Sequence, residues 1–126
     1  MDLQDLQDDC RSDILYGEIT EKIIGCAFEV LNELGTGFLE SAYAKALAIA
    51  LQEKGFRVRC QHPLHVHFRQ RIVGEFYADL VVEGKVIVEL KGAKAIAAEH
   101  QAQIVNYLKA TGIEVGLMIS FWQSET

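Results

Sequence analysis

Hydrophobic positions recur at helical spacing in two stretches of the first half of the chain. Over residues 20–34 the apolar side chains fall three or four positions apart, which predicts an amphipathic helix with Thr20 as N-cap and Gly35 after its end. The same spacing returns over residues 39–54 and stops at Gly55. Two helices joined by a glycine-containing turn are therefore expected.

From residue 58 onward, apolar and polar residues alternate. Alternation over 58–68 predicts a strand with one apolar and one polar face, and apolar residues at even positions over 72–82 and 86–91 predict two more strands. Pro63 lies inside the first of them and cannot donate a ladder hydrogen bond, which indicates an edge strand or a break.

Helical spacing resumes over residues 97–110, with Gly112 as its stop. The segment 115–121 is apolar throughout, so we expect a last strand buried on both faces. The element order is α-α-β-β-β-α-β. The first 16 residues read as an acidic, weakly structured lead-in, and residues 17–126 as a single domain.

Composition narrows the classes of protein. Half of the 126 residues are apolar, which is enough for a packed core, and no apolar run is long enough to span a membrane. Three cysteines without a C-x-x-C pair indicate neither a disulfide framework nor a zinc site. We therefore expect a cytoplasmic protein without a membrane partner.

The net charge of −6 argues against a protein that coats nucleic acid. The charge is unevenly distributed, however. Five aspartates against one arginine give the first 13 residues −4, and the other 113 residues carry only −2. A mildly acidic body of this kind remains compatible with a nucleic-acid substrate.

The turn between the second and third strands decides which side chains share a face. A two-residue loop would pair Val82 with Lys85 and place Asp79 and Glu89 on opposite faces. A three-residue loop would pair Val81 with Lys85 and place both carboxylates on one face. We favour the three-residue loop because it gathers the apolar positions of all three strands against the helices. A bulge near Asp79 would have the same effect.

In that register Asp79 lies opposite Ile87, and Glu89 is its diagonal neighbour with Lys91 on the same face. Two carboxylates could hold Mg²⁺, which prefers oxygen ligands, and the lysine could stabilise charge on a phosphoryl group. The alternative is a solvated strand end at which Lys91 neutralises Glu89.

Asp79 followed by Glu89-Leu90-Lys91 resembles the D…(D/E)-x-K core of the PD-(D/E)XK nuclease superfamily, with Ala78 where a proline often stands. Upstream, Gly37 to Tyr43 matches the G-x-x-E-x-x-Y signature of the GxxExxY family. Downstream, Gln103 to Tyr107 matches the Q-x-x-x-Y motif of the RecB-like branch. The resemblance as a whole covers about residues 18–121.

The resemblance implies a restriction-endonuclease-like three-layer α/β core, with a central mixed sheet flanked by helices. It also implies a Mg²⁺- or Mn²⁺-dependent nuclease acting on nucleic acid, with DNA favoured over RNA. The implied catalytic residues are Asp79, Glu89, Lys91 and Gln103, the implied metal ligands Glu40, Asp79 and Glu89, and the implied supporting residues Tyr43 and Tyr107.

Each of the helical residues also has a plainer interpretation. Glu40 could be an exposed glutamate favoured at a helix start, Tyr43 a core residue, and Gln103 a solvated side chain beside a packed Tyr107. At the level of the molecule, the alternative is a non-catalytic nucleic-acid-binding or protein-assembly module that keeps the nuclease fold. A hydrolase of small phosphate esters is a third option, and a homodimer or a protein partner stays open.

Overall fold

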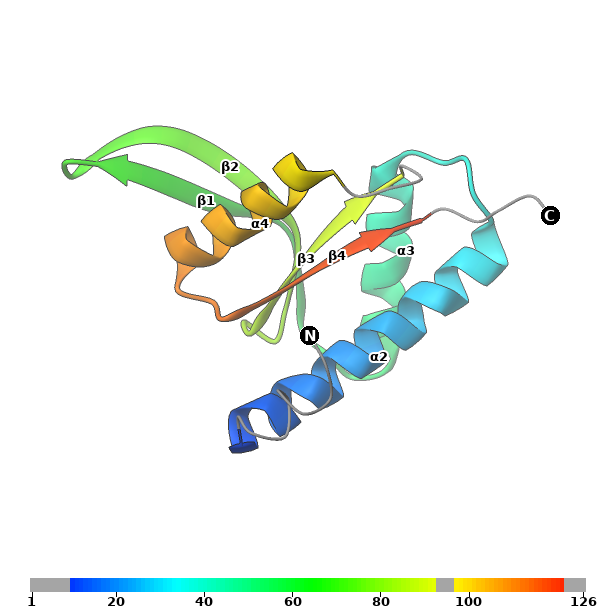
Figure 1. Ribbon diagram of the computed structural model, residues 1–126. Coiled ribbons are helices and arrows are strands. Elements are labelled where there is room, and N and C mark those ends of the chain that lie inside the picture. Colours follow the sequence, from blue (N-terminus) through cyan, green and yellow to red (C-terminus); the bar gives the residue numbers. More distant parts are fainter. Residues whose placement is uncertain (1–9, 93–96, 122–126) are drawn as a thin grey trace.

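The computed structural model describes residues 10–92 and 97–121 as an α/β fold (Figure 1). Its elements are α2 (Cys10–Leu34), α3 (Glu40–Glu53), β1 (Val58–Phe68), β2 (Arg71–Val82), β3 (Val86–Lys91), α4 (Ala98–Thr111) and β4 (Val115–Ser120). This order is the predicted one. Among the described residues, none of the helices combines the length and apolar character that a membrane span requires.

The four strands form one mixed sheet in the order β1-β2-β3-β4. β1, β2 and β3 pair antiparallel, whereas β4 returns through α4 to pair parallel with β3. Pro63 lies on the edge strand β1 opposite Tyr77, as the sequence predicts. The expectation that β4 is buried on both faces is wrong. β4 is the other edge of the described sheet, and all six of its residues are half-buried because it has one neighbouring strand.

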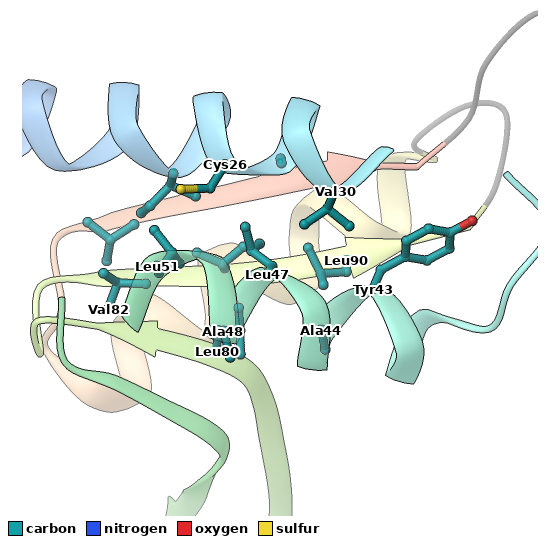
Figure 2. Close-up of a cluster of buried hydrophobic side chains, with 14 of the residues drawn as sticks. Cys26, Val30, Tyr43, Ala44, Leu47, Ala48, Leu51, Leu80, Val82 and Leu90 are labelled. Atoms are coloured by element: carbon teal, nitrogen blue, oxygen red, sulfur yellow. The ribbon is translucent and has the colours of Figure 1, made fainter. Parts of the chain in front are cut away.

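The helices α2 and α3 cover one face of the sheet, and their apolar side chains interlock with those of β2 and β3 (Figure 2). Leu47 and Leu51 of α3 and Ile23 of α2 are completely buried in this layer. Burial of side chains of this size contributes about 1.5–3 kcal/mol each, so this cluster is the main source of stability.

On the opposite face, α4 packs through Ile104 and Tyr107 against Val81 and Ile87. The approach is close at Gly116 of β4, where an added Cβ would lie 2.8 Å from Cδ1 of Ile104. The sheet is therefore covered on both faces, which gives the three layers that were predicted.

The first helix begins earlier than its pattern indicated. α2 starts at Cys10, and Thr20 lies inside it, where its Oγ1 donates a hydrogen bond to the carbonyl oxygen of Gly17 at 3.0 Å. The prediction of Thr20 as an N-cap is therefore wrong, because a threonine can make this bond within a helix as well as at its start. Residues 1–9 of the predicted lead-in lie outside the described residues.

The β2–β3 turn is a three-residue loop, but it is placed one residue further along than predicted. Val82 pairs with Val86 and Val81 with Ile87, so Lys85 belongs to the loop instead of pairing with Val81. Odd-numbered residues still pair with odd-numbered ones, so the predicted parity is confirmed. The shift removes the predicted pairing of Asp79 with Ile87 and brings Asp79 level with Glu89.

Along β2 the alternation of faces is interrupted next to Asp79. Leu80 and Val82 pack toward α2 and α3, as their even numbers predict, whereas Ala78 packs with Val81 in the layer below α4. The prediction of one continuous apolar face on β2 is therefore wrong. On the neighbouring strand, between the pairs that flank this position, Gln61 adopts a φ of +51°.

Candidate active site

The carboxyl groups of Asp79 and Glu89 join β2 and β3 at the end of their backbone pairing. The paired register runs from the turn to Leu80 and Val88. Beyond it, the amide of Asp79 donates to Oε1 of Glu89 at 3.1 Å, and the amide of Leu90 donates to Oδ2 of Asp79 at 2.8 Å. Each carboxylate thus accepts a hydrogen bond from the backbone of the opposite strand. The two acidic side chains are held face to face.

Glu89 is 4% exposed and is the one charged residue among the buried side chains of the described chain. Burial, followed by the negative charge of Asp79, raises the pKa of its carboxyl group to about 7. Two carboxylates held this close repel each other, and a bound cation would relieve that repulsion. An all-oxygen pair of this kind fits Mg²⁺ or Mn²⁺, which proteins often bind through one or two carboxylates.

Lys91 follows the pair at the end of β3, and Glu40 at the start of α3 reaches the next residue, Gly92. The amide of Gly92 donates to Oε1 of Glu40 at 3.2 Å, which ties the start of α3 to β3. The pKa of the Glu40 carboxyl group is lowered by the hydrogen bond from its own amide, then by that from Gly92, and further by the positive charge of Lys91. The charge of Lys91 acts in the same direction on the pKa of Glu89. Lys91 therefore lies within electrostatic reach of both acids.

The structure brings Asp79 and Glu89 together but does not place Glu40 in one group with them. Within the described chain, no three His, Cys, Asp or Glu side chains form a cluster that could hold one metal ion. Glu40 is exposed and turned to Gly92, whereas Glu89 is turned to Asp79. The acidic centre is a pair with a third carboxylate nearby.

Tyr43 is buried and fixes the loop that leads into Glu40. Its hydroxyl donates to the carbonyl oxygen of Gly35 at 2.6 Å and accepts from the amide of Phe38 at 3.2 Å. Its ring stacks on Phe121 with centroids 4.4 Å apart. The packing role that the sequence left open for Tyr43 is thus present, and the hydroxyl adds two hydrogen bonds that hold the turn before α3.

From the other layer, α4 presents Gln103 and Tyr107 on one face, as their i, i+4 spacing predicts. Nε2 of Gln103 donates to the Tyr107 hydroxyl at 3.0 Å. Burial raises the pKa of Tyr107, and the charges of Glu89 and Asp79 raise it further, which places its hydroxyl within electrostatic reach of the acidic pair. Tyr107 thus holds Gln103 through its hydroxyl and is influenced by the charges of both carboxylates.

Two glycines that position the site were missed by the sequence interpretation. Gly92 supplies the amide that holds Glu40, and Gly116 allows α4 to approach the sheet. A glycine directly after Glu89-Leu90-Lys91 and one inside an otherwise apolar strand were the available signals.

A mixed sheet between two helical layers, with an acidic pair where two of its strands separate and a lysine next to it, is a restriction-endonuclease-like arrangement. The chain belongs to the PD-(D/E)XK nuclease superfamily, whose family model matches residues 17–126. Nucleases of this superfamily generally depend on divalent metal ions and act on nucleic acid. Searches of curated proteins and of solved structures gave no match.

Proposed function

We propose that the protein is a divalent-metal-dependent nuclease that hydrolyses phosphodiester bonds in nucleic acid, with DNA preferred to RNA. The observation that supports the proposal is that Asp79 and Glu89 face each other where β2 and β3 separate. Each carboxylate accepts a hydrogen bond from a backbone amide of the opposite strand. Glu89 is buried beside the half-buried Asp79, so ionising both carboxyl groups costs free energy, and a bound cation would offset that cost.

Asp79 and Glu89 would hold the Mg²⁺ or Mn²⁺ ion, with Glu40 joining from α3 directly or through water. When bound, the ion supplies a Lewis acid for the phosphoryl oxygens and lowers the pKa of water. Hydrolysis forms a bond from the water oxygen to phosphorus and breaks the bond to the sugar oxygen, which takes up a proton.

The other proposed roles belong to the chain's own side chains. The ammonium group of Lys91 would stabilise the negative charge that grows on the phosphoryl group and help to orient the attacking water. Gln103, whose amide is held by Tyr107, would contact the phosphate. Tyr43 would act only by holding the turn before Glu40. The match of residues 37–43 to the GxxExxY signature, and of residues 103–107 to the RecB-like motif, supports these roles by resemblance.

Cleavage of labelled oligonucleotides with Mn²⁺ or Mg²⁺ tests the proposal. We expect Asp79→Asn, Glu89→Gln and Lys91→Ala each to lower the cleavage rate at least about 100-fold, as removal of a charge-stabilising group commonly does. Matched controls are Glu53→Gln and Lys45→Ala, two exposed positions on α3, which should cleave like the wild type. Glu40→Gln tests the third carboxylate.

A second candidate is a non-catalytic nucleic-acid-binding or protein-assembly module. The observation in its favour is that both carboxylates already accept hydrogen bonds from backbone amides, a structural role that needs no ion. Absence of cleavage of single- and double-stranded DNA and RNA at high Mn²⁺ would favour this module. Metal-dependent activity restricted to small phosphate esters would instead indicate a hydrolase of such esters.

A further inference from the structure

A groove of about 840 Å³ lies between α4 and the outer part of the β1–β2 hairpin, residues 65–76. Phe76 lines it from β2, His65 and His67 from β1, and Gln103 and Asn106 from α4. This volume is typical of clefts that bind small organic groups. The groove therefore has the size and the mixed lining of a ligand site.

The ring of Phe76 forms an aromatic shelf in this groove. It is 44% exposed, so the core does not account for it. It lies along its own strand over Gly74, where an added Cβ would come within 2.9 Å of its Cε2. A flat, partly exposed aromatic ring is a stacking surface for a base, and every nucleobase has a face that can use it.

The groove leads to the proposed active site through Tyr107. The ring centroids of Phe76 and Tyr107 are 6.1 Å apart, and the Tyr107 hydroxyl accepts a hydrogen bond from Gln103. The charges of Asp79 and Glu89 also act on the pKa of Tyr107. A base on Phe76 would thus belong to a nucleotide close to the acidic pair. The amides of Gln103 and Asn106 offer donors and acceptors for its edge.

The hairpin that carries Phe76 is the basic part of an acidic protein. Residues 57–82, which cover both strands of the hairpin, contain four of the five arginines of the chain against two acidic residues, Glu75 and Asp79, and so carry +2 in a chain of net −6. Arg69 and Arg71 lie at its tip. Arginine binds phosphate oxygens in a bidentate manner. Charge complementarity therefore favours a nucleic-acid strand along the hairpin over an acidic or neutral partner.

A base inside a duplex already stacks on its neighbours with both faces, so neither face is free to stack on the ring of Phe76. A base reaches the shelf only when it is out of its duplex, which costs least for a strand that is already single. We propose that the groove binds an unpaired nucleobase, so that single-stranded regions of DNA or RNA are the preferred substrate. This inference rests on the proposed nuclease function, because it assumes that the bound strand continues to the acidic pair.

Binding without cleavage tests the groove. Fluorescence anisotropy in EDTA gives the affinity of a short labelled single strand, as DNA and as RNA, and of a hairpin duplex of the same composition. We expect the wild type to prefer the single strand and Phe76→Ala to weaken its binding about 5- to 150-fold, the range found for loss of one stacked base. Phe28→Ala is the matched control, because Phe28 is 61% exposed on α2 in the opposite layer.

A second measurement changes the nucleic acid, so its main result comes from the wild-type protein. Abasic positions in the single strand should weaken binding to the wild type by a similar factor and should have no further effect on Phe76→Ala, and Phe76→Trp should restore base-dependent binding. The proposal is overturned if the wild type binds the duplex as tightly as the single strand, or if abasic positions leave its affinity unchanged. Failure to bind any oligonucleotide would overturn it in favour of a protein partner.

The two proposals fail separately. Base-dependent binding without cleavage in Mg²⁺ or Mn²⁺ would contradict the nuclease function but support the proposed base site in the groove. Metal-dependent cleavage that is unchanged in Phe76→Ala, on single strands and on duplexes alike, would contradict the proposed base site but support the nuclease function.

Discussion

At the scale of single residues, Glu89 links function to stability. Its carboxyl group has a pKa of about 7 against an ordinary value of 4.5, first because it is buried and second because Asp79 lies beside it. The folded protein thus holds this proton more tightly than the unfolded chain does. Protonated Glu89 therefore stabilises the folded state. This contribution is fully present below pH 4.5 and is lost as the pH rises through about 7. At 1.36 kcal/mol per pKa unit, the loss is at most about 3 kcal/mol.

We predict that the free energy of unfolding of the metal-free protein falls between about pH 5 and pH 8, and that Glu89→Gln removes most of this dependence. Denaturant titrations in EDTA measure it, with Glu53→Gln as an exposed control that should follow the wild type. Divalent ions at about pH 8 should stabilise the wild type more than Glu89→Gln. Parallel pH profiles for the wild type and Glu89→Gln would contradict the assigned pKa.

The acidic pair shows how far a sequence argument reaches at this scale. Parity along the strands was enough to place Asp79 and Glu89 on one face. It could not give their reciprocal hydrogen bonds, because these require β2 and β3 to separate at that level. The bond of Glu40 to Gly92 joins residues 52 apart in sequence, and no local pattern encodes such a contact.

At the scale of elements, the position of α4 depends on Gly116. We predict that Gly116→Ala destabilises the protein by about 1–3 kcal/mol, because its Cβ would meet Ile104 at 2.8 Å and push α4 away from β4. Since Gln103 and Tyr107 are carried on α4, cleavage should slow as well. Thermal and denaturant unfolding, together with cleavage rates, check both effects.

Gly25→Ala is the matched control for this substitution. Gly25 lies within α2 with no atom inside 4 Å of an added Cβ, so the change should stabilise the helix by up to about 1 kcal/mol and leave cleavage unchanged. Equal effects of the two substitutions would show that close packing at Gly116 does not position α4.

Periodicity predicted every described element, and each wrong prediction about an element has a physical cause. α2 extends back to Cys10 through residues whose pattern is weak. β4 is apolar like a central strand but has a single neighbour, a fact of topology that a run of apolar residues cannot reveal. The change of face beside Asp79 interrupts the alternation on β2, so Ala78 packs toward α4, and Phe76 on the same strand lines the groove.

At the scale of the whole molecule, the buried core of the described chain lies apart from the outer part of the β1–β2 hairpin, where we propose that nucleic acid binds. The core lies between α2, α3 and the inner halves of the strands, and residues 65–76 include no buried side chain. The same segment carries Arg69 and Arg71, whereas the protein as a whole is acidic. An acidic body reduces non-specific attraction to nucleic acid, so a local basic projection would decide where a strand binds.

This separation predicts the outcome of shortening the hairpin. Val66 pairs with Gly74, so residues 67–73 can be replaced by a two-residue Asn-Gly turn, which suits a tight hairpin. We expect the free energy of unfolding to change by less than about 1 kcal/mol, because no buried side chain is lost.

Single-strand affinity of the shortened protein should fall, and its dependence on salt should weaken. Each lost phosphate contact lowers the slope of log K against log salt by about 0.7 for a single strand, so loss of Arg69 and Arg71 should lower it by about 1.4. Anisotropy titrations at several salt concentrations measure the slope. Arg57→Ala/Arg59→Ala, at the base of the hairpin, shows whether the effect is confined to the tip. An unchanged slope in the shortened protein would mean that the substrate path does not follow the hairpin.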